Sequence, residues 1–76
     1  MNDEQSTILG ILSQHSEPAL AVEQIKHEHG IEQIGLNSLK FMLAIIEIEH
    51  QLGRSVFNVD IMPRLKTVGD VLALVA

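Results

Sequence analysis

The strongest constraint on the fold is a long stretch with the pattern of a single helix. Residues 39–52 contain no glycine or proline, and their apolar side chains recur at helical spacing. Asn37, which precedes the stretch, favours a helix N-cap, and Gly53, which follows it, favours a helix end. We therefore predict a helix that begins at about Ser38 and stops at Gly53, with the rest of the chain packed around it.

This predicted helix carries more apolar surface than one core contact requires. With Leu39 at zero and about 100° per residue, one apolar group lies between about 180° and 240°: Phe41, Ile45, Ile48 and Leu52. A second group runs from about 300° round to 40°: Leu39, Met42, Leu43 and Ile46. Lys40, Glu47 and Gln51 form a polar stripe, and Glu49 interrupts the apolar arc. A core-facing stripe needs only about 100°, so either several sides are packed, or one half meets a partner.

Two weaker helical patterns precede this segment. Apolar residues at positions 8, 9, 11 and 12 predict a first helix that is capped by Asp3 or Ser6 and runs to about His15. The apolar residues within 19–28 predict a short helix that ends at Gly30. Two helices, separated by a break at Glu17-Pro18, are therefore expected before the central one.

The remaining segments are a connector, an irregular stretch and a last helix. Residues 31–36 are expected to form an ordered connector, because their three apolar side chains can attach it to a core. Residues 56–65 are expected to be irregular or to form one short helical turn. Thr67, followed three residues later by Asp70, has the pattern of a capping box. It predicts a helix over the following apolar run, with a strand over 71–75 as the alternative.

Composition favours a binding domain over an enzyme. The chain has 76 residues, which corresponds to a single domain over 1–76 and leaves little volume for a deep substrate pocket. Apolar residues make up 46% of it, but the only aromatic residues are two phenylalanines, so the core must be mainly aliphatic. Ten acidic residues against five basic ones give a formal net charge of -5, which argues against nucleic-acid binding.

Several other classes of protein and site are excluded because the sequence lacks the residues or patterns that they require. It has no cysteine, so disulfides and zinc–thiolate sites are excluded. No apolar run approaches the ~18 residues of a membrane span, and the acidic segment 1–4 is unlike a signal peptide, so we expect a cytoplasmic domain. His15 and the His27-Glu28-His29 segment lack the spacing of a metal site, and we expect no metal. Ser38 lacks the Gly-x-Ser-x-Gly elbow of a hydrolase, and no catalytic residue is predicted.

The residues that lead into the long helix resemble a known family. Residues 35–39, Gly-Leu-Asn-Ser-Leu, resemble the Gly-Leu-Asp-Ser-Leu signature with which acyl carrier proteins begin their second helix. Residues 67–71, Thr-Val-Gly-Asp-Val, resemble the start of that family's last helix, at about the family's spacing. The resemblance covers most of the chain. It implies an all-α fold, a small four-helix bundle with a long first loop and a short third helix.

The resemblance also implies a function. Ser38 would carry 4′-phosphopantetheine, attached from coenzyme A by a phosphopantetheinyl transferase, with Asn37 and Leu39 as its neighbours in the cofactor site. The thiol of that arm holds an acyl group as a thioester. The chain would thus be a free-standing carrier phosphoprotein, not an enzyme, in fatty-acid, polyketide or specialised lipid synthesis. The first turn of a helix suits this role, because its free N–H groups and its dipole favour a phosphate. The implied partners of this monomer are acyl-loading and acyl-processing enzymes of the ligase, ketosynthase or acyltransferase types.

Two departures from the family pattern concern its partners. Asn37 stands where the family has an aspartate that contacts the basic transferase, so we expect slower or more specialised modification. The expected partner-binding residues of the long helix are Lys40, Met42, Leu43, Ile46, Glu47 and His50. Leu43 and His50 stand where acidic residues are usual, which predicts apolar docking and a dedicated pathway. Two alternatives stay open: an aminoacyl or peptidyl carrier, and an unmodified helical interaction module.

Overall fold

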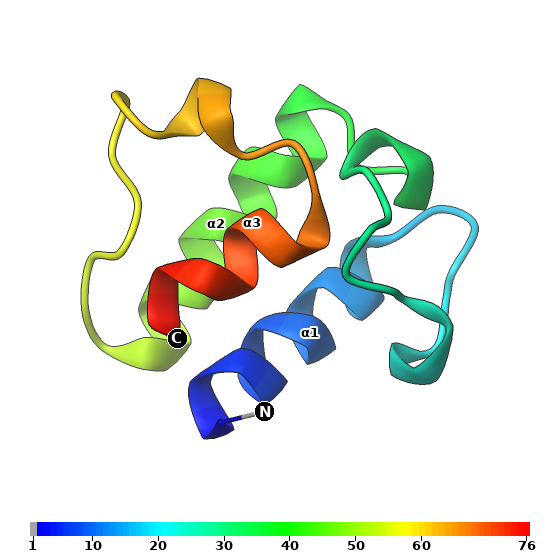
Figure 1. Cartoon of the computed structure of the whole chain (residues 1–76), viewed down its shortest axis with the longest axis horizontal. Helices are drawn as coiled ribbons and strands as arrows, with labels where there is room; N and C mark the ends of the chain where they lie inside the picture. The colour runs from blue at the N-terminus through cyan, green and yellow to red at the C-terminus, as the bar shows by residue number, and fades with distance from the viewer. Residues whose placement is uncertain (1) are drawn as a thin grey trace.

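The computed structural model describes residues 2–76, in which three α-helices form the framework. Helix α1 spans Asp3–His15, α2 spans Ser38–Leu52 and α3 spans Val68–Leu72. Four 3₁₀ turns complete the regular structure: η1 (Val22–Gln24), η2 (Glu32–Ile34), η3 (Met62–Arg64) and η4 (Ala73–Val75). Helix α1 packs against α2 and α3, and η4 continues α3 to the C-terminal end, near the start of α1 (Figure 1).

The predicted helical class is confirmed, but a four-helix bundle is not. Residues 2–76 contain no β-strand, and one isolated bridge joins Gly30 to Thr67. Where the family resemblance implies a short third helix, the chain forms only η3. This turn stops early because Leu65 is non-helical (φ -86°, ψ 89°) and the carbonyl of Lys66 accepts from the N–H of Ile31 at 2.9 Å. The backbone there pairs with a distant segment and cannot also continue a helix.

Helix α1 ends at His15, as predicted, but its N-cap and the extent of the second predicted helix differ from expectation. The N-cap of α1 is Asn2, not Asp3 or Ser6: its side chain accepts from the N–H of Gln5 at 2.7 Å, and the Gln5 side chain returns the bond at 3.1 Å. The cap moves to Asn2 because Gln5, three residues later, completes a capping box. The short helix expected over 19–28 is reduced to η1, and Gly30 does not end it. Residues 27–31 instead pair through their backbone with residues 66–69.

The core is aliphatic, as predicted, and draws on every part of the fold. Helix α1 contributes Ile8, Leu9, Ile11 and Leu12, and the C-terminal helices contribute Val68, Val71, Leu72 and Val75. The connector over 31–36 buries its three apolar side chains, as predicted: Ile31, Ile34 and Leu36. Phe41 is the only aromatic residue in this buried set from residues 2–76.

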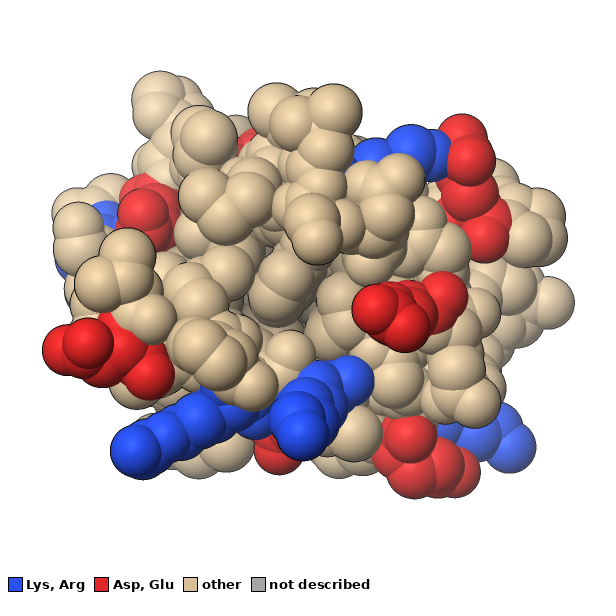
Figure 2. All heavy atoms as spheres, turned by 90° about the horizontal axis from the view of Figure 1, so that it is seen from above, with Lys and Arg blue, Asp and Glu red and all other residues tan. Residues whose placement is uncertain are grey.

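The two apolar groups of α2 have different environments. The first group lies in or against the core: Phe41, Ile45 and Ile48 are buried and Leu52 is half-buried. The second group faces outward, with exposed fractions of 69% for Leu39, 48% for Met42, 48% for Leu43 and 60% for Ile46. From above the N-terminal end of α2, the middle of the surface is largely uncharged and most charged side chains lie around its rim (Figure 2). One half of the helix packs inward, and the other half is free to contact a partner.

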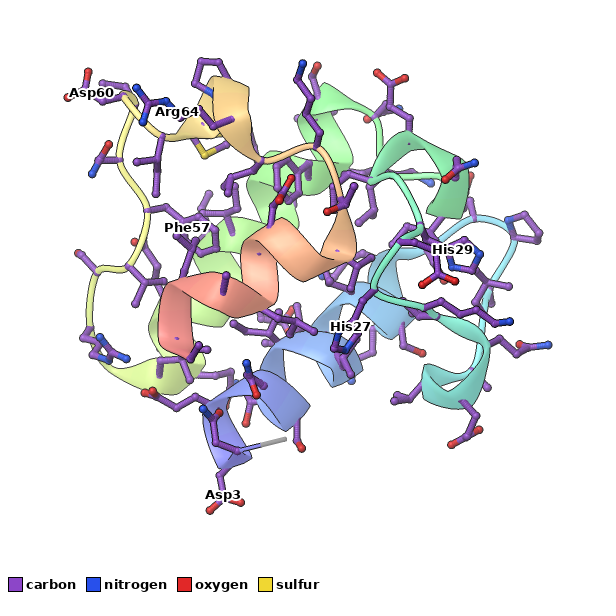
Figure 3. All side chains as sticks on the ribbon, viewed as in Figure 1. Asp3, His27, His29, Phe57, Asp60 and Arg64 are labelled. Carbon is purple, nitrogen blue, oxygen red and sulfur yellow. The ribbon has the colours of Figure 1, made fainter. Side chains whose placement is uncertain are left out.

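Glu49, between these two groups, anchors the segment that follows α2. Its Oε2 atom accepts from the N–H groups of Val56 (2.9 Å) and Phe57 (3.1 Å). Phe57 is half-buried against the core and points from its segment toward the helices (Figure 3). The carboxylate thus attaches residues 53–61 to the side of α2, a role that the helical pattern did not indicate.

We expect Glu49→Ala to lower the free energy of unfolding by about 1.5–3 kcal/mol, the usual contribution of hydrogen bonds to a charged group. Two N–H groups lose their acceptor, and the segment around Phe57 is released from α2. Urea denaturation of the purified variant measures the change. Glu23→Ala, at an exposed position of η1, is the control and should change stability by less than about 0.5 kcal/mol. Equal stability of the two variants would contradict the anchoring role.

Candidate functional site

The chain enters α2 through a tightly constrained turn. The turn η2 ends at Gly35, whose φ of 84° lies in the left-handed region that suits glycine. A Cβ atom at this position would overlap the backbone of Glu17, so the turn has no room for a side chain. Leu36, the next residue, is buried in the core. Gly35 and Leu36 therefore fix the direction in which the chain continues from the core to Asn37 and Ser38.

Both predicted ends of α2 are confirmed. The Oδ1 atom of Asn37 accepts from the N–H of Lys40 at 2.9 Å, and its carbonyl accepts from the N–H of Phe41 at 2.8 Å. At the other end, Gly53 has a φ of 70°, and its N–H donates to the carbonyl of Glu49 at 2.9 Å. Asn37 thus caps the helix through its own side chain and carbonyl.

Ser38 is exposed at the first position of α2. Its hydroxyl forms no hydrogen bond with any group in residues 2–76, and within the same range the N–H groups of Ser38 and Leu39 have no acceptor. Ser38 therefore takes no part in capping α2, because Asn37 is the N-cap residue. A free hydroxyl lies next to free N–H donors at the positive end of a helix, where an attached phosphate is favoured.

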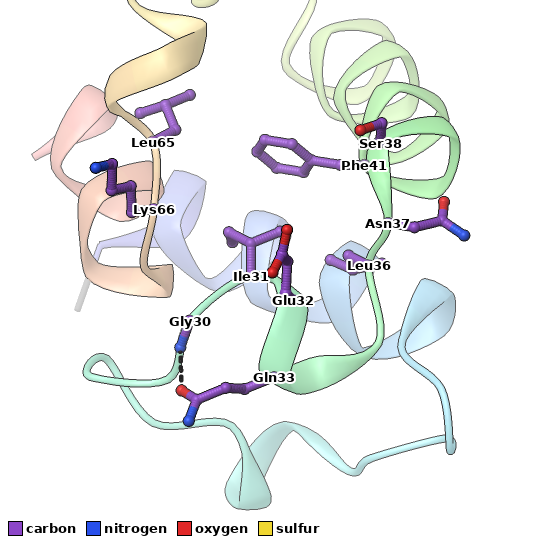
Figure 4. A pocket seen from close by; sticks show the side chains of 10 residues that line it. All are labelled: Gly30, Ile31, Glu32, Gln33, Leu36, Asn37, Ser38, Phe41, Leu65 and Lys66. Carbon is purple, nitrogen blue, oxygen red and sulfur yellow. Dashed lines mark hydrogen bonds between the residues drawn. The ribbon is translucent and has the colours of Figure 1, made fainter.

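A cleft of about 430 Å³ opens beside Ser38 (Figure 4). Its apolar lining consists of Ile31, Leu36, Phe41 and Leu65, and its polar lining includes Glu32, Gln33 and Lys66. The Oε1 atom of Gln33 accepts from the N–H of Gly30 at 2.5 Å, as the dashed line in Figure 4 marks. Local sequence patterns do not predict this cleft, since its walls come from segments that are far apart in the chain.

The wall opposite Ser38 is held by backbone pairing between two loops. Besides the bond from Ile31 to Lys66, the N–H of Val68 donates to His29 and that of Gly69 donates to His27, each at 2.9 Å. At the start of α3, the predicted capping box is confirmed: Thr67 Oγ1 accepts from the N–H of Asp70 at 3.1 Å. This pairing brings Leu65 and Lys66 to the cleft.

Asp70 reinforces the same wall. Its Oδ2 atom accepts from the backbone N–H groups of Lys66 and Thr67, each at 3.0 Å. These bonds, that from Lys66 first, lower the pKa of the Asp70 carboxyl below its usual value. The ionised carboxylate therefore favours the folded arrangement around Lys66.

We expect acid to weaken the fold through Asp70. Its pKa is lower in the folded chain than in the unfolded chain, so the ionised group stabilises the fold above the unfolded pKa, and this contribution is lost as the pH falls through the folded pKa. The hydrogen bond from Arg54 likewise lowers the pKa of the Glu4 carboxyl, so the stabilising contribution of this group is also lost as the pH falls. Asp70→Asn should flatten the acid side of the stability–pH curve measured by urea denaturation. Asp60→Asn, at an exposed position, is the control. If the stability of Asp70→Asn falls in acid as steeply as that of the natural chain, Asp70 does not cause the loss of stability.

The expected partner-binding residues divide into two sets. Leu39, Met42, Leu43, Ile46 and His50 are exposed, as an interaction surface requires. Lys40 and Glu47 are half-buried and form ion pairs within the chain: Lys40 with Glu17 at 2.5 Å, and Glu47 with His15 at 3.2 Å. These two charges connect α2 to the first loop and to α1, so the free part of the face is mainly apolar.

A second, smaller groove of about 210 Å³ extends this face. It lies between α2 and the segment that Glu49 anchors, and its lining includes Met42, Ile46, Phe57, Val59 and Met62. Val59 is 84% exposed, although it is apolar. A helical wheel of residues 39–52 cannot identify this second groove. The segment that forms its other side is irregular, and its position depends on the hydrogen bonds to Glu49.

The histidine-rich loop has a structural role. His29 Nδ1 accepts from the N–H of Lys26 at 3.0 Å, and the carbonyls of His27 and His29 belong to the pairing with α3 (labelled in Figure 3). Within residues 2–76, no group of three or more potential ligands could hold a metal ion. No helix in the same range has the length and apolar character that crossing a membrane requires.

These features define a small helical domain that displays an unbonded serine hydroxyl at a helix start, beside a cleft. A family model described as the phosphopantetheine attachment site matches residues 7–75. The chain therefore belongs to this family, that of the acyl carrier proteins, as the sequence resemblance indicated. Neither the curated proteins nor the solved structures contain a significant match.

Members of this family carry a covalently attached 4′-phosphopantetheine and are not themselves catalytic. The residues around Ser38 fit the group: the hydroxyl is unbonded, the neighbouring N–H groups lack acceptors, and the adjacent cleft is open. When bound, the group supplies a thiol that holds cargo as a thioester. Membership also implies encounters with modifying enzymes and with enzymes that handle the cargo.

Proposed function

We propose that Ser38 is the attachment point for 4′-phosphopantetheine and that residues 1–76 form one acyl carrier domain. The observation that supports this most strongly is that one residue caps α2 while the next one leaves its hydroxyl exposed. Asn37 satisfies the capping requirement, while the Ser38 hydroxyl stays exposed and without a partner in residues 2–76. A serine that is unnecessary for the helix but open to solvent is suited to a phosphodiester linkage, which requires an accessible hydroxyl.

The neighbouring residues position the serine. Asn37 fixes the first turn, Gly35 and Leu36 fix its direction, and the exposed side chain of Leu39 offers an apolar contact beside it. Asn37 also removes the negative charge that the family usually places before the serine. Because exposed ionic contacts contribute about 0–1 kcal/mol, a transferase that relies on this charge should modify Ser38 up to about fivefold more slowly.

Incubation with coenzyme A and a broad-specificity phosphopantetheinyl transferase, followed by intact-mass measurement, tests the proposal. The expected result is the gain of a single phosphopantetheinyl group. If no transferase produces this gain, the chain is an unmodified helical interaction module, and the carrier proposal fails. An aminoacyl or peptidyl carrier shares the fold and the arm, so it differs only in cargo. Mass analysis of the thioester-bound group on protein purified from its own host separates these alternatives.

We further propose that this carrier is a free-standing, cytoplasmic monomer that serves a dedicated pathway, such as polyketide or specialised lipid synthesis. The exposed face of α2 that contains Met42, Leu43 and Ile46 is apolar, and its extension by Val59 adds to that character. Of the predicted polar contacts, Lys40 and Glu47 form ion pairs within the chain. Partners that match this face are acyl-loading and acyl-processing enzymes with an apolar recess, for which desolvation contributes more than charge pairing.

We expect the affinity for such a partner to depend weakly on ionic strength and strongly on Ile46. Ile46→Asp should weaken binding at least about tenfold, since a charge would be buried in an apolar contact. Val22→Asp, a similar change at an exposed apolar residue of η1, is the control and should stay within about twofold. Calorimetric titrations at low and high salt measure both effects. A steep loss of affinity with added salt would show that charge pairing, not apolar contact, holds the complex.

A further inference from the structure

The segment that joins α2 to α3 carries most of the chain's basic residues. Residues 53–67 contain three of the five basic residues but one of the ten acidic residues. Arg54 donates two hydrogen bonds to Glu4, of 2.7 and 3.2 Å. Arg64 and Lys66 are exposed, and in the part of the chain that the structure describes their side chains form no hydrogen bond or ion pair. An acidic chain thus has two unpaired cations close together on one short segment.

This segment lies beside the exposed apolar side of α2. Met62 lines the smaller groove together with Met42, and Lys66 lines the cleft together with Ser38 (Figure 4). Arg64, labelled in Figure 3, is the last residue of η3 and lies between these two positions in the sequence. In Figure 2, blue side chains lie along one edge of the largely uncharged middle of the face. We call Arg64 and Lys66 the basic edge of the apolar surface.

Backbone hydrogen bonds hold the basic edge in place. The N–H of Arg64 donates to the carbonyl of Ile61 at 2.9 Å. The N–H of Lys66 donates to Oδ2 of Asp70 at 3.0 Å, and its carbonyl accepts from the N–H of Ile31 at 2.9 Å. The backbone of the edge is therefore fixed, while both cationic groups remain available to a partner.

The carboxylates of α2 are not available to a partner in the same way. Glu47 is paired with His15, and Glu49 accepts from two backbone N–H groups of the segment that follows α2. Two exposed carboxylates remain nearby: Asp60 is the single acidic residue of the segment, and Glu32 lines the cleft from η2. The helix itself therefore presents apolar contacts, and the charge beside them is supplied by the basic edge.

We propose that the basic edge binds carboxylates at the rim of a partner enzyme's apolar recess, an inference that rests on the proposed function. The partner's recess covers the exposed apolar side of α2 while its acidic rim meets Arg64 and Lys66. A partner with a basic docking surface is disfavoured, because like charges would be brought together. An anionic lipid surface is disfavoured as well, because the chain's formal net charge is -5.

The basic edge orients the partner, whereas the apolar contact supplies most of the affinity. An exposed ion pair changes binding by no more than about fivefold, since water competes for both charges. Charges at the rim of an interface act mainly on the rate of association. Salt screens them, so their effect should be largest at low ionic strength. A weak overall dependence of affinity on salt and a strong dependence on Ile46 are both consistent with this role.

The rate at which Ser38 is loaded by a broad-specificity transferase with a basic docking surface tests the basic edge. Arg64→Glu and Lys66→Glu should each be loaded about two- to fivefold faster than the natural chain at low salt, because repulsion becomes attraction. The difference should fall below about 1.5-fold in about 1 M sodium chloride. Lys26→Glu is the charge-matched control, exposed and outside the lining of both cavities, and should load like the natural chain.

A reciprocal change in the transferase tests the preference for carboxylates. One basic residue of its docking surface is replaced by glutamate, and the same chains are loaded at low salt. The altered transferase should load the natural chain faster than Lys66→Glu, which inverts the order found with the unaltered enzyme. Such an inversion measures a direct coupling between the two surfaces.

The outcomes separate the two levels of inference. Failure to gain mass with any transferase overturns the carrier proposal and the basic edge with it. Normal mass gain at equal rates in the natural chain, Lys66→Glu and Lys26→Glu overturns the basic edge alone. Faster loading of Lys66→Glu by both forms of the transferase overturns the preference for carboxylates. Cosedimentation of the natural chain, but not of Arg64→Glu, with vesicles of phosphatidylcholine and phosphatidylglycerol would assign the edge to a lipid surface and overturn the protein partner.

Discussion

Ser38→Ala should yield a folded protein that gains no phosphopantetheinyl group under any transferase. The hydroxyl is the only group at this position that can form the phosphodiester, so loading should be lost completely. Folding should be unaffected, because Ser38 is exposed, its hydroxyl has no hydrogen-bond partner within residues 2–76, and Asn37 retains the cap. Alanine is also the better helix former, so the free energy of unfolding should change by less than about 0.5 kcal/mol.

Intact mass after incubation with coenzyme A measures loading, and circular dichroism with urea denaturation measures folding. Ser55→Ala is the matched control, since Ser55 is also exposed, lies outside the helices and should load like the natural chain. Asn37→Asp restores the charge usual in the family and should speed modification while keeping the cap. A Ser38→Ala protein that still gains the group would place the attachment elsewhere in the chain.

Gly35→Ala should be the most damaging single methyl addition in the chain, with a loss of about 3 kcal/mol or more. An L-residue at a φ of 84° already costs about 1–2 kcal/mol. The new Cβ would also overlap the backbone of Glu17, which cannot rotate away as a long side chain can. Glu17 is itself fixed, because its N–H donates to the carbonyl of Ile34 at 3.0 Å. The turn that directs Asn37 and Ser38 out of the core would shift.

Two other glycines provide the controls. Gly53 has a similar φ of 70° but nothing within 4 Å of the added Cβ, so Gly53→Ala should cost only about 1–2 kcal/mol. Gly10 lies inside α1 with nothing within 4 Å, so Gly10→Ala should stabilise by about 0.5–1 kcal/mol. Urea denaturation of the three variants measures the series. If Gly35→Ala lowers the free energy of unfolding no more than Gly53→Ala does, the contact with Glu17 does not constrain the turn.

Local patterns predicted much of the framework and the chemical centre of the site. Asn37, Gly53 and the Thr67–Asp70 pair predict helix ends, because capping acts between residues at most four apart. Ser38 is singled out by the resemblance of residues 35–39 to the family's signature. The predicted caps of α1, Asp3 and Ser6, are wrong, because Asn2 and Gln5 form a capping box ahead of them. The helix predicted over 19–28 is also wrong, since the chain forms only η1 there.

The surroundings of the site were not predictable in the same way. The helical wheel identified two apolar groups on α2 but could not decide which one faces the core. Glu49 looked like an interruption of the apolar arc, yet it holds Val56 and Phe57 in place. Lys40 and Glu47 looked like free charges for a partner, yet each is paired within the fold. These outcomes depend on segments that approach α2 from elsewhere in the chain.

The sequence by itself determined where α2 begins and ends, that the core is aliphatic, and that a serine stands just after a competent cap. Periodicity, capping and composition are properties of neighbouring residues, so they can be read without knowing the fold. Only the tertiary structure decided that Leu39 and Ile46 stay exposed and that Lys66 reaches the cleft beside Ser38. Burial and clefts arise where distant segments meet, here residues 27–31 and 66–69, whose backbone groups satisfy one another.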